Sequence, residues 1–148
     1  MEVESPEELG YSRIRYNLSE SSVTDRSIAE LGLTIPSLTL LYGEHRGSAT
    51  LRAAIVAGER NLDADDVLIT SGAAAALFIV STSLLSSGDQ LVVVRPNYAT
   101  NLETPRAIGC DISYIDLVFE EEFRLDLDRV AAAITPKTRI VSVTCPHN

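Results

Sequence analysis

Three groups of residues in this sequence have the chemical types that bind a ligand. The first is a run of small residues, Thr70-Ser-Gly-Ala-Ala74, where the pattern predicts a turn from a strand into a helix. Backbone N–H groups at such a helix start suit a phosphate, because they donate hydrogen bonds and the helix dipole favours an anion. A tight turn that packs a helix closely on a sheet would use the same residues, and the turn alone favours neither interpretation.

The other two groups are Arg95–Tyr98 and Thr144–Asn148. Tyr98 follows a proline that restricts the turn, and its ring offers a stacking surface for a planar ring bound above the phosphate turn. Asn148 carries a side-chain amide that can donate a hydrogen bond to a hydroxyl or phenolate oxygen. Taken alone, Tyr98 would be interpreted as a residue that packs within its loop.

Alternating strands and helices place these groups together. The alternation predicts an α/β fold, a parallel-type sheet flanked by helices in three layers, in which ligands bind beyond the carboxyl ends of the strands. The predicted strands are Val67–Thr70, Leu91–Val94, Asp111–Asp116 and Arg139–Val143. The predicted helices are 25–31, 49 to about 60 with Ser48 as its cap, 73 to about 85, 99–108 and 127–134. Pro105 disfavours a regular helix in the fourth of these.

Charge and composition exclude several classes of protein. The net charge of −9, with no basic stripe, argues against nucleic acid and anionic membranes as partners. The N-terminus is acidic where a signal peptide is basic, and no apolar run is long enough to span a bilayer, so a cytoplasmic protein is expected. His45 and His147 have no metal-ligand neighbours at short spacing, and Cys110 and Cys145 form no CxxC pair, so no metal site is predicted.

A dinucleotide site is the main alternative for the phosphate turn. Such a site needs the pattern GxGxxG, and this turn has only Gly72. It also needs an acidic residue about twenty positions further on, where this sequence has Arg95-Pro96. Because an arginine there would favour a 2′-phosphate, an NADP-type oxidoreductase domain remains an alternative. A non-catalytic dimerisation remnant is a second one.

Taken together, the motifs resemble the class I/II aminotransferases, pyridoxal-phosphate enzymes of fold type I. The resemblance covers roughly Leu41 to Asn148 and depends on the order and spacing of many short pieces. These pieces are Leu41–Arg52, Asp65–Ala73, Ser87–Asp89, Arg95–Tyr98, Ala107–Gly109, Thr135–Thr138 and Pro146–Asn148. It implies that the chain contains the start of the large domain of a fold type I transferase.

The resemblance implies a role for several residues in binding pyridoxal 5′-phosphate. Ala73 and Ala74 would hold the cofactor phosphate through their backbone N–H groups, where many relatives also offer a hydroxyl. Tyr98 would stack on the pyridine ring. Asn148 would donate a hydrogen bond to the phenolic oxygen.

The resemblance also implies a homodimer with shared active sites. Tyr42 is similar to the tyrosine that reaches the phosphate of the neighbouring subunit, while Glu20 and Ser21 would lie near the substrate mouth. The substrates would be an amino acid and a 2-oxo acid. On this view residues 1–47 form an N-terminal arm and dimer-contact segment, and residues 48–148 form the first part of the cofactor-binding domain.

The catalytic groups of the family are missing from this chain. The family uses a lysine that forms a Schiff base with the cofactor, an aspartate at the pyridine nitrogen and an arginine for the substrate carboxylate, all beyond the equivalent of Asn148. The single lysine, Lys137, is predicted in a turn at the opposite end of the sheet. The 148 residues are therefore expected to be the first part of a longer enzyme and inactive alone. The resemblance also implies that later strands insert between several of those present here, so only the second and third strands would be sheet neighbours, unless these residues pair their strands in another way.

Overall fold

The computed structural model describes residues 6–16 and 25–146. By its internal contacts the chain divides into one unit that includes Met1–Leu41 and a second unit, Tyr42–His147. The predicted division by role, at residues 47 and 48, stays a prediction. Within the described ranges, no helix is both long and apolar enough to cross a lipid bilayer.

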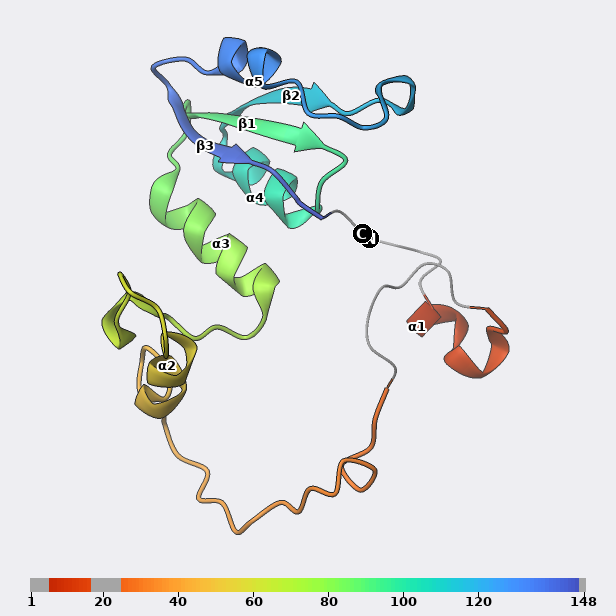
Figure 1. Ribbon diagram of the computed structural model, residues 1–148, viewed down its shortest axis with the longest axis vertical. Coiled ribbons are helices and arrows are strands. Elements are labelled where there is room, and N and C mark those ends of the chain that lie inside the picture. The colour runs from red at the N-terminus through yellow and green to blue at the C-terminus, as the bar shows by residue number, and fades with distance from the viewer. Residues whose placement is uncertain (1–5, 17–24, 147–148) are drawn as a thin grey trace. The chain divides into compact units, whose positions relative to one another are not determined.

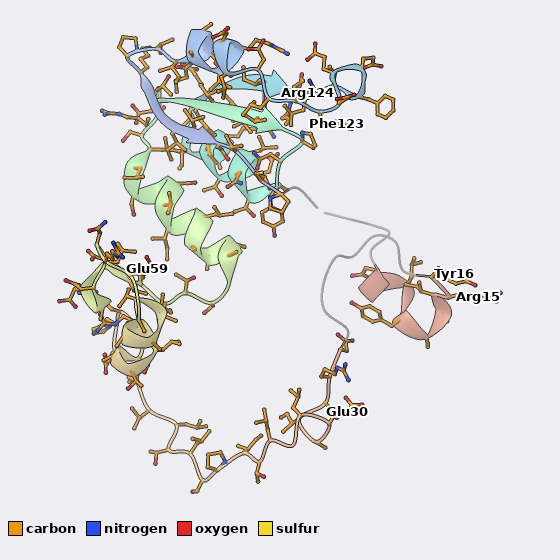
Figure 2. The ribbon with its side chains drawn as sticks, viewed as in Figure 1. Arg15, Tyr16, Glu30, Glu59, Phe123 and Arg124 are labelled. Atoms are coloured by element: carbon orange, nitrogen blue, oxygen red, sulfur yellow. The ribbon has the colours of Figure 1, made fainter. Side chains whose placement is uncertain are left out.

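In the described residues of the first unit, 6–16 and 25–41, the helical elements are α1 (Pro6–Leu9) and the 3₁₀ turn η1 (Tyr11–Arg13). The guanidinium of Arg15 lies 5.2 Å from the centre of the Tyr16 ring, and both side chains are labelled in Figure 2. Most of its large apolar side chains are exposed.

A parallel sheet organises the second unit (Figure 1). Its strands are β1 (Gln90–Arg95), β2 (Asp111–Asp116) and β3 (Thr138–Ser142), in the spatial order β2-β1-β3. β1 is central because its run of apolar residues is buried on both faces, as is typical of a parallel strand.

The pairing of β1 with β3 corrects the expectation that only the second and third predicted strands would be neighbours. β1 has a polar backbone edge on each side, and each edge must be hydrogen-bonded when the strand is buried. β2 covers one edge and β3 the other, both in parallel register. The chain therefore crosses back over β1 between β2 and β3.

Helices cover both faces of the sheet, which confirms the predicted three layers. Figure 1 shows α3 (Ala73–Leu84) and α4 (Thr100–Ile108) on one face and α5 (Leu127–Ala133) on the other. The α5 face carries an apolar core centred on Val92, Val94 and Ile115. On the opposite face, α3 packs against α4, and α4 packs against β1 and β2.

Local sequence signals explain where these helices begin and end. The Asp126 carboxylate accepts hydrogen bonds from the Asp128 and Arg129 N–H groups, at 2.9 and 3.2 Å, and so caps α5. Gly109 ends α4 with a left-handed φ of 91°. Pro105 removes one helical hydrogen bond from α4, but its ring is fully buried, and this packing keeps the helix regular.

Three predicted elements differ from the structure. The helix after Ser48, α2, is shorter than expected and spans Ala49–Ile55, followed by a turn with Gly58 at a φ of 94°. Residues 67–70 lie between the 3₁₀ turn η2 (Ala64–Asp66) and α3 and do not form the predicted strand. No described strand pairs with them, and among their backbone N–H groups only that of Ile69 donates to a backbone carbonyl, that of Arg46.

The third difference is at residues 25–31, where the predicted helix is only a turn. The Ser27 N–H donates to the Glu30 carboxylate at 2.8 Å, and the Glu30 N–H donates to the Ser27 hydroxyl at 3.1 Å. Gly32 follows with a φ of 64°. So short an exposed segment forms one capped turn but gains too few hydrogen bonds to offset the cost of helix nucleation.

Candidate functional site

The start of α3 presents backbone N–H groups that no side chain caps. Gly72 precedes the helix with a φ of 92°, and the Ala76 N–H donates to the Gly72 carbonyl at 3.3 Å. The N–H groups of Ala73, Ala74 and Ala75 lie in the first turn, ahead of any acceptor within the helix. A Cβ at Gly72 would meet nothing within 4 Å, so the space beside the residue that precedes the helix is open.

This helix start has the properties that a phosphate needs. α3 has 12 residues, which is long enough to carry a helix dipole, and there is no acidic residue in its first turn. Ala73 and Ala74 are both exposed. The residues predicted to bind the cofactor phosphate therefore fit that group, and they do so through their backbone alone.

Tyr98 lies beyond the carboxyl end of β1. Its side chain is 54% exposed, and neither an aromatic contact nor a cation–π contact involves it within the described part of the chain. Its backbone is fixed, because its N–H donates to the Asn97 side-chain oxygen at 2.8 Å and its carbonyl accepts from the Asn101 N–H at 3.0 Å. In Figure 1, α3 and α4 both begin toward the end of the sheet where β1 and β3 finish.

Asn97 belongs to the predicted group Arg95–Tyr98, but the sequence alone predicted no role of its own for it. Its carboxamide connects the loop before Tyr98 to Ser142 at the end of β3 and to Thr144 beyond it. The only local signal was an asparagine after a proline, which is typical of turns in general. The partners in these two hydrogen bonds are separated by 45 and 47 positions in the sequence, so no local pattern predicts them.

Arg95 is paired with a neighbouring carboxylate and a neighbouring ring. Its guanidinium donates two hydrogen bonds to the Asp116 carboxylate, at 2.6 and 2.7 Å, and lies 4.1 Å from the centre of the Tyr114 ring. The hydrogen bond from Arg95 lowers the pKa of Asp116 and raises that of Arg95 itself. A guanidinium paired with a carboxylate is less available to the 2′-phosphate of a dinucleotide than an unpaired one.

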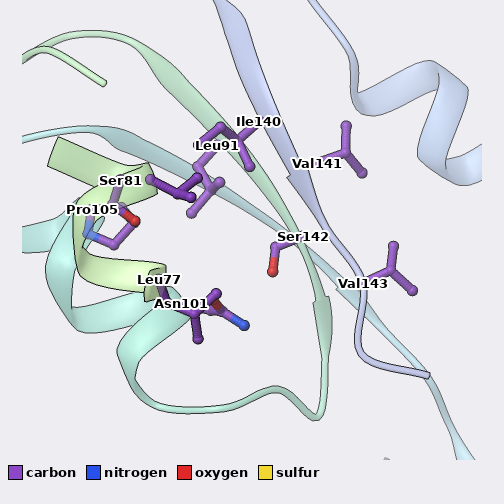
Figure 3. Close-up of a pocket in the computed structure, with 10 residues that line it drawn as sticks. Leu77, Ser81, Leu91, Asn101, Pro105, Ile140, Val141, Ser142 and Val143 are labelled. Atoms are coloured by element: carbon purple, nitrogen blue, oxygen red, sulfur yellow. The ribbon is translucent and has the colours of Figure 1, made fainter. Parts of the chain in front are cut away.

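Two hollows lie elsewhere in the second unit. One of about 240 Å³ lies between α3, α4 and the sheet, where Leu77, Pro105 and Val143 give it a mainly apolar lining (Figure 3). The other, of about 330 Å³, lies beside three glutamates at 120–122 and Arg124, which is labelled in Figure 2 on the loop after β2. Neither lining suits a phosphate, because one is apolar and the other is rich in carboxylates.

The remaining predicted residues are distributed as follows. Tyr42 precedes α2 with a fully exposed side chain. Lys137 lies just before β3, and its carbonyl accepts a hydrogen bond from the N–H of Gln90, the first residue of β1. It therefore lies at the amino end of the sheet, opposite Tyr98.

Glu20, Ser21 and Asn148 lie outside the described residues. Across the described ranges, no three metal-ligating side chains gather into a metal site.

Comparison with known proteins identifies the family. The family description "Aminotransferase class I and II" matches residues 17–148. The chain is 35% identical over 112 residues to the arginine–pyruvate transaminase AruH of Pseudomonas aeruginosa, an alignment that covers 72% of this chain and 28% of the relative. It is 31% identical over 147 residues to the capreomycidine synthase of Streptomyces vinaceus, covering 93% of this chain and 38% of that enzyme.

Solved structures agree with the sequence relatives. The aspartate aminotransferase of Thermus thermophilus superimposes with a TM-score of 0.69 and 29% identity, over 73% of this chain and 30% of that one. The alanine aminotransferase of Pyrococcus furiosus gives a TM-score of 0.67 at 29% identity, over 73% and 29% of the two chains. The chain belongs to the class I and II aminotransferases, the pyridoxal-phosphate-dependent enzymes of fold type I. It spans 28–38% of the length of the sequence relatives named above.

Proposed function

We propose that this chain supplies the cofactor-binding part of a pyridoxal-phosphate-dependent aminotransferase, which transfers an amino group from an amino acid to a 2-oxo acid. The observation that carries the proposal is the start of α3, where no side chain caps the first backbone N–H groups and where Ala73 and Ala74 are exposed. Family membership supplies the identity of the phosphate ligand. When bound, the cofactor supplies an electron sink for the reaction at the substrate amino group.

In this proposal the residues bind and orient the cofactor. Ala73 and Ala74 donate hydrogen bonds from their backbone to the phosphate, and Tyr98 stacks its half-exposed ring on the pyridine. Asn148 donates a hydrogen bond to the phenolic oxygen. The engagement of Arg95 with Asp116 favours this cofactor over NADP.

The proposal also concerns partners. Tyr42 of one subunit would bind the cofactor phosphate of the other in a homodimer, and its full exposure leaves it available for that contact. Glu20 and Ser21 would lie near the substrate. Lys137 lies at the amino end of the sheet, so the lysine that bonds to the cofactor would come from outside these 148 residues, and the chain alone would be inactive.

A proline at the first residue of α3 tests the phosphate site. Proline is well tolerated at the first position of a helix, so Ala73→Pro removes one N–H donor and leaves the helix intact. Pyridoxamine 5′-phosphate needs no lysine to bind. We expect the affinity for it to fall about tenfold or more, which corresponds to a loss of at least about 1.4 kcal/mol of binding free energy. Calorimetric titration of the protein expressed from its complete reading frame would measure this change.

Leu127→Pro is the matched control for this experiment. Leu127 is the first residue of α5, its side chain is exposed, and the Asp126 cap binds the two N–H groups after it. The control should therefore keep the affinity of the unmodified protein. Equal affinities for Ala73→Pro and the unmodified protein would place the phosphate elsewhere. Ala74→Ser, which adds a hydroxyl, should bind as well as the unmodified protein or slightly better.

A further inference from the structure

The Asn97 side chain makes hydrogen bonds to three parts of the site at once. Its amide nitrogen donates to the Val94 carbonyl at 2.9 Å, and to the carbonyl and hydroxyl of Ser142, both at 3.4 Å. Its oxygen accepts from the Tyr98 N–H and the Asn101 amide, both at 2.8 Å, and from the Thr144 hydroxyl at 3.0 Å. The partly buried carboxamide thus has every donor and acceptor engaged.

These contacts join the three elements that meet beside Tyr98. Val94 belongs to β1, Ser142 ends β3, and Asn101 lies in the first turn of α4. The backbone of Tyr98 is bound directly, and Thr144 leads toward the end of the chain. A single side chain therefore sets the position of the Tyr98 backbone relative to both strands and the helix.

We propose that Asn97 is a positioning residue, which holds the Tyr98 ring and the segment after β3 in the arrangement that binds the cofactor. The inference rests on the proposed function, because the proposed function assigns the cofactor to the Tyr98 ring that Asn97 positions. Asn97 acts through Tyr98 and Thr144, without contacting the cofactor itself. An amide is required here, since the same side chain must donate to the strands and accept from Tyr98, Asn101 and Thr144.

Gln90 provides a matched comparison at the other end of β1. Its nitrogen donates to the Ser113 hydroxyl at 2.8 Å and to the Ala133 carbonyl at 3.2 Å. Its oxygen accepts from the hydroxyls of Thr135 and Thr138. Gln90 therefore joins β1 to β2, β3 and the end of α5 through the same chemistry, but at the end of the sheet that carries Lys137 and lies away from Tyr98.

The test replaces each amide by an acid of the same shape. Asn97→Asp and Gln90→Glu keep the oxygen that accepts hydrogen bonds and turn the donating nitrogen into an oxygen that repels a backbone carbonyl. Both variants should melt at a lower temperature than the unmodified protein. Pyridoxamine 5′-phosphate is achiral, so the circular dichroism of its absorption band when bound reports how the protein orients its ring.

We expect Asn97→Asp to lower the affinity for pyridoxamine 5′-phosphate at least fivefold and to change the amplitude of the induced band. Gln90→Glu should keep the affinity within twofold and leave the band unchanged. Thr144→Val removes only one hydroxyl donor from the network, so it should fold well and change the band in the same direction by a smaller amount. Its effect keeps the inference testable if Asn97→Asp fails to fold.

The possible outcomes separate this inference from the proposed function. If the unmodified protein does not bind pyridoxamine 5′-phosphate, the proposed function is wrong and the role of Asn97 falls with it. If the unmodified protein binds it and the Asn97→Asp or Thr144→Val protein shows the same affinity and band, only the role of Asn97 is wrong. Equal losses of affinity in Gln90→Glu and Asn97→Asp would also contradict the inference, because they would reflect a general loss of stability.

Discussion

Removing the ring of Tyr98 should weaken cofactor binding by an amount that its exposure allows us to estimate. Tyr98 is 54% exposed. An aromatic side chain buries about 150–250 Å² when fully covered, so roughly 100 Å² of Tyr98 is free for a stacked ligand, worth about 2.5 kcal/mol. The stacking geometry adds roughly 0.5–1.5 kcal/mol. Ordering of the ring and ligand offsets part of this sum, so we expect Tyr98→Ala to weaken binding by about tenfold to a hundredfold.

Two further variants separate stacking from simple packing. Tyr98→Phe keeps the ring, so it should bind pyridoxamine 5′-phosphate with nearly unchanged affinity. Phe119→Ala removes another exposed aromatic ring, which lies in η3 (Phe119–Glu121) against Phe123, and should not affect binding. Fluorescence titration and the dissociation rate of the ligand would measure each effect.

The stacking argument would be refuted by one clear pattern. If Tyr98→Ala and Tyr98→Phe both change the melting temperature while the ligand dissociates as it does from the unmodified protein, Tyr98 only packs within its loop. The cofactor site would then lie elsewhere, even if the start of α3 still bound a phosphate.

Two predictions concern stability. Gly47→Ala should lower the free energy of unfolding in urea by more than Gly58→Ala, because both glycines have positive φ but only at Gly47 would the new Cβ overlap the Ile69 side chain. Asp116→Asn should destabilise the protein at neutral pH and much less in acid. Arg95 lowers the pKa of Asp116 below its ordinary value of 3.8. The stabilisation of the fold by the ionised Asp116 is therefore complete above pH 3.8 and is lost as the pH falls through the lowered pKa. Equal destabilisation of Asp116→Asn at both pH values would contradict this assignment.

The elements that the sequence predicted well are those whose signals are local. The apolar run of β1, the Asp126 cap of α5 and the Gly109 end of α4 each depend on a few adjacent residues. Residues 67–70 have the composition of a strand, but a strand also needs a partner, and partners come from distant parts of the chain. The alternation of elements therefore predicted the layers of the fold better than the pairing of its strands.

The candidate site shows the same division between local and distant signals. The uncapped start of α3 was predictable, because a glycine followed by small residues is enough to leave N–H groups free. The role of Asn97 was not, since it appears only when β3 pairs with β1 and brings Ser142 and Thr144 to the loop. The order of the motifs predicts a role for Tyr98, and the structure shows which hydrogen bonds hold its backbone.

The two carboxamides at the ends of β1 explain why one end of this sheet is suited to a ligand. At the amino end, Gln90 is nearly buried, and its partners lie on the turns and strands that close over it. A buried network of this kind stabilises the fold but leaves no group for a ligand. At the carboxyl end, Asn97 makes hydrogen bonds to the backbone and side chains around Tyr98, and the Tyr98 ring itself stays exposed. The same chemistry therefore closes one end of the sheet and, at the other, fixes an open aromatic surface on the side where α3 begins.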